Sequence, residues 1–212
     1  MLHCNMLTAV REDRILFKEL SFIINPGEIV QVAGPNGVGK TTLFRLIIGL
    51  SSPYSGEILW QGCSIFEQRE SFHRQLLYLG HKTGIKPELT PLENLQFFHK
   101  LHVTEEDVDL WHVLALVGLA GYEDVSTAQL SAGQQRRVAL ARLWMNDCPL
   151  WVLDEPFTAI DKSGIKVLQS LFVKHAQRGG MVLLTTHQDM TINSSLFRKV
   201  ELQHFAAGEE YV

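Results

Sequence analysis

The 212-residue sequence has few cysteines, no excess of basic residues and no long hydrophobic run, and each absence excludes a class of function. Cys4, Cys63 and Cys148 are too few and too scattered for a disulfide framework or a zinc site, and such usage is typical of a reducing, cytosolic compartment. With 19 Lys and Arg against 23 Asp and Glu, the net charge of −4 gives no basic footprint for nucleic acid. The longest apolar stretches, around residues 30–33, 150–153 and 181–184, fall far short of the ~20 residues that span a bilayer.

Residues 1–10 also lack the basic and then apolar segments of a signal peptide. A hydrophobic fraction of 46% and a charged fraction of 20% are those of an ordinary globular protein, and the length suits one well-cored domain. We therefore expect a single domain, which would need another chain to anchor it if it works at a membrane.

Three short apolar runs are followed by polar residues that can bind a ligand or take part in catalysis. Residues 29–33, 150–153 and 181–186 have the length of strands that are buried on both faces, as in a parallel sheet. The first runs into a glycine-rich loop, the second ends at Asp154 and Glu155, and the third ends at His187. Because ligands bind beyond the carboxyl ends of such strands, we expect these groups to meet at one edge of a sheet.

The remaining patterns are mostly helical, after strand-like residues 15–24 and a turn at 25–28. Apolar periodicity predicts helices at 40–49, 135–146 and 165–176, and two more at 92–101 and 105–117. The last two interrupt the alternation of strand and helix. They predict a helical subdomain at about 84–128, inserted into an α/β core formed by about 1–83 and 129–212.

The glycine-rich loop matches the phosphate-loop pattern G-x-x-x-x-G-K-[ST] at residues 34–41. Its glycines let backbone N–H groups approach phosphates, Lys40 supplies a positive charge, and the hydroxyl of Thr41 can ligate Mg²⁺. The helix that follows points its positive end at the anion. The predicted ATP-binding residues of this loop are Gly34, Pro35, Asn36, Gly37, Val38, Gly39, Lys40, Thr41 and Thr42.

Asp154 and Glu155 follow four apolar residues. In a phosphate-loop protein, Asp154 is the expected second Mg²⁺ contact, and Glu155 can polarise an attacking water. The structural alternative is an acidic pair that ends a strand and faces solvent.

Residues 130–134, with the sequence L-S-A-G-Q, precede a predicted helix. Ser131 and Gln134 have the spacing of a capping box, which is sufficient to explain them locally. Gly133 in the first turn disfavours the helix, however, and is better explained if a ligand such as a γ-phosphate approaches the backbone. The two explanations are compatible.

These motifs together resemble an ATP-binding-cassette (ABC) ATPase domain. They comprise the phosphate loop, L-S-A-G-Q before Gln135-Arg136-Arg137, and residues 153–156, 159–161 and 186–187. The usual signature is L-S-G-G-Q, from which Ala132 departs. The resemblance implies a P-loop NTPase fold of the α/β class, with a mostly parallel core sheet, an N-terminal antiparallel β region and an inserted helical subdomain.

The same resemblance implies a head-to-tail homodimer that encloses two ATP molecules with Mg²⁺. Ser131, Ala132, Gly133 and Gln134 of one copy would close on the γ-phosphate held by the other. Asp161 would lie at the dimer seam, and His187 would contact the γ-phosphate beside the catalytic Glu155.

Two positions depart from the wider family. The loop that joins the core to the helical subdomain usually holds a Gln that contacts Mg²⁺, and His81 occupies that place. Imidazole can ligate a metal or bridge to it through water, so the identity of this contact stays open. The aromatic residue that stacks on adenine is also missing, and its place falls near Arg11. A guanidinium can stack on a base, and an equally good interpretation is a solvated surface charge.

Further stretches closely resemble the haem-exporter ATPases of bacterial cytochrome c maturation. They are residues 59–62, 79–95, 118–121, 129–144 and 154–161. This resemblance implies a peripheral subunit on the cytoplasmic face of the inner membrane, bound to integral membrane subunits of a haem-delivery complex. ATP turnover would serve a periplasmic haem chaperone, by release of the loaded chaperone or by movement of haem. No nucleic-acid partner is expected.

Three alternatives remain open at this point. One is the ATPase subunit of another small ABC transporter for lipid, drug or solute. A second is a soluble ABC ATPase of DNA repair or translation, which the acidic balance and the lack of a coiled-coil insertion disfavour. A third is a phosphate-loop kinase, which the capped Ser131 helix and Glu155 disfavour.

Overall fold

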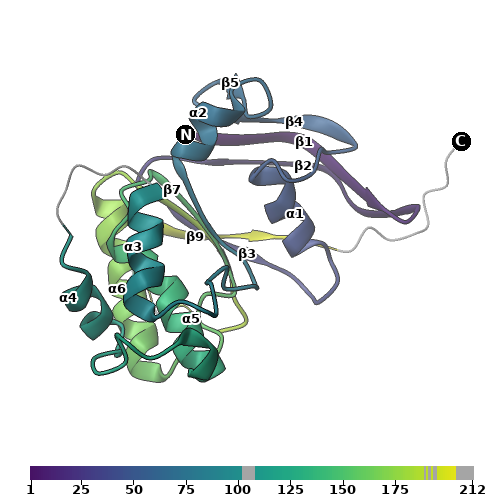
Figure 1. Cartoon of the computed structure of the whole chain (residues 1–212). Coiled ribbons are helices and arrows are strands. Elements are labelled where there is room, and N and C mark those ends of the chain that lie inside the picture. The colour runs from purple at the N-terminus through teal and green to yellow at the C-terminus, as the bar shows by residue number, and fades with distance from the viewer. Residues whose placement is uncertain (102–107, 189, 191, 193–194, 204–212) are drawn as a thin grey trace, which may run out of the picture.

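The computed structural model describes residues 1–101, 108–188, 190, 192 and 195–203. They form two β-sheets with helices between and beside them (Figure 1). No helix among the described residues combines the length and the apolar character needed to cross a bilayer.

The core is a five-stranded sheet in which every pair of neighbours is parallel. In the order β6-β7-β8-β3-β9, its strands are Leu76–Leu79, Leu150–Asp154, Met181–Thr185, Ile29–Ala33 and Phe197–Glu201. All residues of β7 and β8 are buried, which confirms that the wholly apolar runs are central parallel strands. The sequence patterns did not predict β6 and β9, which form the edges.

Alternate residues of β7 face two different hydrophobic clusters, because successive side chains of a strand point to opposite faces. Leu150 and Val152 pack with α1 (Lys40–Ile47) and the N-terminal sheet, whereas Trp151 and Leu153 pack with α6 (Lys162–Gln177). The central sheet is therefore covered on both faces.

The second sheet is antiparallel, and it confirms the expected N-terminal β region. In the order β2-β1-β4-β5, its strands are Arg14–Ile24, Leu2–Arg11, Ser55–Trp60 and Cys63–Ser64. Helix α1 lies between the two sheets (Figure 1). A short helix, α2 (Arg69–Arg74), precedes β6.

Helices α3 (Pro91–Leu101), α4 (Leu110–Leu116) and α5 (Ala132–Ala141) gather on one side of the molecule with α6 (Figure 1). Short 3-10 turns, η1 (Thr127–Gln129) and η2 (Arg142–Trp144), flank α5. A third hydrophobic cluster joins α3 and α4 to one face of α5.

Several helix boundaries differ from the sequence predictions. Helix α4 starts at Leu110, because the Asp109 side chain accepts hydrogen bonds from the backbone N–H groups of Trp111 and His112. Residues 105–107 of that prediction lie outside the described residues. Helix α5 starts at Ala132, three residues earlier than predicted, because the capping box at Ser131 belongs to its first turn. It gives way to η2 at Arg142, before the predicted end at residue 146.

Candidate functional site

The phosphate loop, residues 34–42, follows β3 and runs into the first turn of α1, and its three glycines have positive φ angles. A Cβ on Gly34 would lie 2.5 Å from the backbone oxygen of Leu202, and one on Gly39 would lie 3.2 Å from Cβ of Leu16. A Cβ on Gly37 would meet no atom within 4 Å. Packing therefore demands glycine at Gly34 and favours it at Gly39, whereas Gly37 leaves open space beside the loop that suits a bound phosphate.

Lys40 directs its ammonium group to the start of this loop, and Thr41 directs its hydroxyl to the end of β7. The Lys40 ammonium donates hydrogen bonds to the backbone oxygens of Gly34 and Pro35, at 2.7 and 3.2 Å. The Thr41 hydroxyl lies 3.4 Å from Oδ2 of Asp154. The structure thus brings together the two oxygen ligands that the sequence predicted on separate elements.

Asp154 and Glu155 are held by Thr185, a residue that the sequence patterns did not single out. Its hydroxyl donates a 2.7 Å hydrogen bond to Oδ1 of the buried Asp154 and accepts a 3.0 Å bond from the backbone N–H of Glu155. Glu155 has a left-handed backbone with φ of 50°, which is uncommon for a residue with a side chain. The available sequence signal was a hydroxyl residue at the polar end of a buried strand.

His187 lies beside Glu155, as the adjacent ends of β7 and β8 predicted. Its Nε2 is 3.5 Å from Oε1 of Glu155, and the His187 side chain is 61% exposed whereas that of Glu155 is 23% exposed. The preceding Thr186 is fixed by Gln31, whose buried amide donates a hydrogen bond of 3.1 Å to its backbone oxygen. The imidazole of His187 is therefore accessible to a ligand, and the backbone before it is held in place by Gln31.

Arg136 is a second residue that sequence reasoning missed. The residue is 5% exposed, and its guanidinium donates hydrogen bonds to the backbone oxygens of Gly80, Asp154 and Glu155, at 2.8, 2.9 and 3.0 Å. Burial lowers the pKa of Arg136, and the carboxylates of Asp154 and Glu155 oppose this shift. One buried cation thus joins α5 to the ends of β6 and β7.

The capping box predicted at the start of α5 is confirmed. Ser131 Oγ accepts a hydrogen bond from the backbone N–H of Gln134, and Gln134 Oε1 accepts one from the backbone N–H of Ser131. Ser131 and Ala132 are exposed. A Cβ on Gly133 would lie 3.0 Å from the backbone oxygen of Ala159, so the chain's own packing already favours glycine there.

The segment at residues 159–161 is tied to α5 by an ion pair. Arg137 Nη2 donates to Oδ1 of Asp161 at 2.8 Å, and the Asp161 side chain remains 59% exposed. Ala159 has a φ of 60°. The signature segment, residues 130–134, and the loop at residues 159–161 therefore lie side by side.

His81 and Arg11 lie apart from these contacts. His81 is exposed in the loop after β6, directly after the residue whose carbonyl Arg136 holds. Arg11 ends β1 and forms an exposed ion pair with Glu12, with Nε and Oε1 3.7 Å apart. Within the described part of the chain, neither side chain has a hydrogen bond or ion pair with the phosphate loop or Asp154.

Comparison with known proteins gives consistent matches along the chain. Residues 17–158 match the family described as ABC transporter. The cytochrome c biogenesis ATP-binding export protein CcmA of Vibrio cholerae is 60% identical, over 95% of this chain and 98% of that protein. CcmA of Photobacterium profundum is 54% identical, over 95% of this chain and 99% of that protein.

Two solved structures have the same architecture. The dimeric, post-hydrolysis structure of the ATP-binding cassette MJ0796 bound to ADP and Pi has a TM-score of 0.77 at 25% identity, covering 89% of this chain and 88% of that chain. The ATP-binding subunit of another ABC transporter has a TM-score of 0.80 at 26% identity, covering 88% of this chain and 79% of that one. The chain therefore belongs to the ABC transporter ATPases and, within them, to the cytochrome c biogenesis ATP-binding export proteins.

Proposed function

We propose that the chain hydrolyses ATP as a homodimer in a haem-delivery complex of cytochrome c maturation. The observation that carries the hydrolytic site is the convergence of the phosphate loop, Asp154, Glu155 and His187 at the carboxyl ends of β3, β7 and β8. The identity of 60% to a cytochrome c biogenesis export protein supports the pathway over the other transporter, repair and kinase functions.

In this proposal, residues 34–42 bind the phosphates of ATP, with the Lys40 ammonium on the β- and γ-phosphates. The hydroxyl of Thr41 and the carboxylate of Asp154 would hold Mg²⁺, because they are hard oxygen donors only 3.4 Å apart. When bound, the ion would offset the negative charge of the phosphates. His81 is a further candidate contact, and Arg11 a candidate platform for adenine.

Glu155 would polarise the attacking water. The contacts of its backbone to Thr185 and Arg136 fix the carboxylate relative to the phosphate loop. The Nε2 of His187 would contact the γ-phosphate from beside Glu155, since it lies 3.5 Å from that carboxylate and is exposed. General-base assistance of this kind typically contributes about 10²–10⁴-fold to a rate.

The second half of each site would come from the other copy. Ser131, Ala132, Gly133 and Gln134 would present the N-terminus of α5 to the γ-phosphate across the dimer, and Asp161 would lie at the seam. The exposure of Ser131, Ala132 and Asp161 supports this role, as does the dimeric form of the related cassette MJ0796.

We also propose that residues 84–128 form a helical subdomain on a core of 1–83 and 129–212. The third hydrophobic cluster, which joins α3 and α4 to α5, supports this division. The dimer would bind integral membrane subunits at the cytoplasmic face of the bacterial inner membrane. Its turnover would release a haem-loaded periplasmic chaperone or move haem.

The test is complementation in cells that lack the related cytochrome c biogenesis ATPase. The parent chain should restore covalent haem in c-type cytochromes and should co-purify with integral membrane subunits, whereas Lys40→Ala and Glu155→Gln should not restore the cytochromes. Accumulation of haem-loaded chaperone in the variants would identify release, and its absence would identify haem movement. Restoration by Glu155→Gln at the parent level would contradict the proposal.

A further inference from the structure

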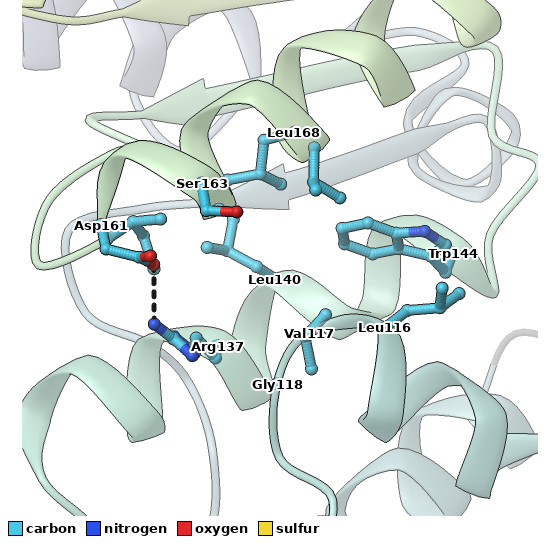
Figure 2. Close-up of a pocket in the computed structure, with 12 residues that line it drawn as sticks. Leu116, Val117, Gly118, Arg137, Leu140, Trp144, Asp161, Ser163 and Leu168 are labelled. Carbon is cyan, nitrogen blue, oxygen red and sulfur yellow. Dashed lines mark hydrogen bonds and ion pairs between the residues drawn. The ribbon is translucent and has the colours of Figure 1, made fainter.

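Two adjoining hollows form one groove along α6, away from the phosphate loop. The first, of about 170 Å³, lies beside the Arg137–Asp161 pair (Figure 2). The second, of about 530 Å³, continues to Arg178. Leu116, Trp144 and Val167 line both hollows, and Leu116 and Val167 are 42% and 41% exposed. We call the combined hollow the α6 groove, with α6 as one wall and the ends of α4 and η2 as the other.

The wall formed by α6 is basic. The helix contains no Asp or Glu, and it carries cations at Lys162, Lys166 and Lys174, with Arg178 just beyond its end. Lys166, Lys174 and Arg178 line the second hollow, and we call these three side chains the basic stripe. All four cations are exposed, and none has an ion pair within the described residues.

The stripe is a local feature of an acidic protein. The whole chain has a net charge of −4, yet the groove brings three of these cations to one rim. Two carboxylates line it as well, and Asp161 is already paired with Arg137. Asp147 lies near the other end, next to the His175 ring that stacks on Trp151. The positive charge of the three cations in the second hollow favours an anionic occupant.

We propose that the α6 groove binds an acidic amphipathic helix of a partner protein. Apolar side chains of that helix would fill the recess between Leu116, Trp144 and Val167. Its carboxylates, four residues apart, would pair with the basic stripe, which extends for about 18 Å from Lys166 to Arg178 at 1.5 Å per residue. A flat anionic bilayer would meet the cations but leave the recess unfilled, and nucleic acid offers no apolar side chains for it.

The proposal does not depend on the cargo of the transporter, since Val167 and the three cations of the second hollow are not among the residues proposed to bind nucleotide. It is tested by photo-crosslinking in cells that express the full chain with its transporter partners. A benzoylphenylalanine at Val167 would capture the occupant, and mass spectrometry would identify the captured segment. We expect one protein segment, with carboxylates at four-residue spacing beside apolar residues.

Charge reversal separates specific capture from chance contact. Lys166→Glu/Lys174→Glu/Arg178→Glu should reduce the crosslink by at least about fivefold, because it replaces attraction with repulsion at three contacts. The control Arg74→Glu/Lys100→Glu/Lys199→Glu has the same change in charge on other exposed surfaces and should leave the yield unchanged. Leu116→Asp should also reduce the yield, and ATP binding should persist in every variant.

Four results would overturn the proposal. They are the absence of a crosslink, capture of lipid or nucleic acid, capture of a second copy of this chain, and equal yields in the two triple variants. Because the cargo and the complementation assay are not involved, such a failure would leave the proposed haem-delivery function intact.

Discussion

The guanidinium of Arg136 donates a 3.0 Å hydrogen bond to the backbone oxygen of Glu155, the residue that we propose activates water. The same side chain also binds the carbonyl groups of Asp154 and of Gly80, the residue before His81. A single buried cation therefore connects α5, which begins within the signature motif, to the end of β7 and to the loop after β6. Movement of α5 would be transmitted directly to Glu155.

Arg136→Met should lower both stability and turnover. Up to three carbonyl groups lose a charged donor, which we expect to reduce the free energy of unfolding by about 2–4 kcal/mol. ATP hydrolysis should fall more than ATP affinity, because the phosphate loop is not contacted by Arg136. Denaturant unfolding and steady-state kinetics measure the two effects. Arg136→Lys keeps the charge without the forked geometry and should be intermediate, so equal unfolding midpoints for all three proteins would refute this role.

Thr185→Val should disturb Asp154 and Glu155 without a change in side-chain shape. The backbone N–H of Glu155 would lose its acceptor and Asp154 its donor, at a cost of roughly 1–3 kcal/mol in the free energy of unfolding. We expect slower hydrolysis with a smaller change in ATP affinity. Thr185→Ser keeps the hydroxyl and serves as the control. If valine and serine variants hydrolyse ATP equally, the hydroxyl does not position the carboxylates.

Gly34→Ala should mainly lower the stability of the fold, whereas Gly37→Ala should mainly lower the affinity for ATP. At Gly34 the new Cβ would lie 2.5 Å from the Leu202 oxygen, so we expect a loss of stability of about 2 kcal/mol or more. At Gly37 there is open space, so only the left-handed backbone contributes, at about 1 kcal/mol. Relative to its loss of stability, the Gly37 variant should lose more ATP affinity than the Gly34 variant, because its methyl group enters the space expected for the phosphate. Thermal unfolding without ATP measures the loss of stability, and the shift in unfolding temperature on addition of ATP measures binding. Equal values of both quantities for the two variants would contradict the placement of a phosphate beside Gly37.

Glu155→Gln should abolish most hydrolysis while ATP binding survives. The amide keeps the size of the side chain but cannot polarise water as a carboxylate does, so turnover should fall by about 10²-fold or more. ATP should then accumulate in a dimer, which light scattering detects. Hydrolysis at the parent rate would show that Glu155 is not the activating residue.

His175 should make the fold sensitive to acid. Burial, the largest cause, lowers its pKa from 6.5 to about 4, so the folded chain keeps the ring neutral while the unfolded chain takes up a proton. This contribution to stability is complete above pH 6.5 and is lost as the pH falls from 6.5 to about 4. Partial exposure reduces its size, which we put at roughly 1–2 kcal/mol. His175→Phe retains a ring against Trp151, and its unfolding free energy should fall less over this range. Parallel pH profiles would exclude His175 as the cause.

Patterns confined to a few neighbouring residues predicted the right structure. The apolar runs became β3, β7 and β8, and the serine and glutamine of the signature formed a capping box. Edge strand β9 went unpredicted because it is only partly apolar, and β6 because an apolar run of four residues is too short for periodicity to distinguish strand from helix. Helix ends were also misplaced at α4 and α5, where single capping side chains decide the first turn.

The sequence by itself determined the phosphate loop and the order of the polar groups behind the apolar runs, because each depends on local spacing, and the resemblance of these motifs to a known family indicated the ABC ATPase class. Only the tertiary structure decided that Thr185 binds the carboxylate of Asp154 and that Arg136 binds the backbone oxygens at the end of β7. It alone also decided that the backbone of Leu202 excludes a side chain at Gly34, and that Lys166 and Lys174 of α6 line a groove. These features join residues far apart in the chain, and no local pattern records which distant carbonyl or hydroxyl a folded backbone brings within hydrogen-bonding distance.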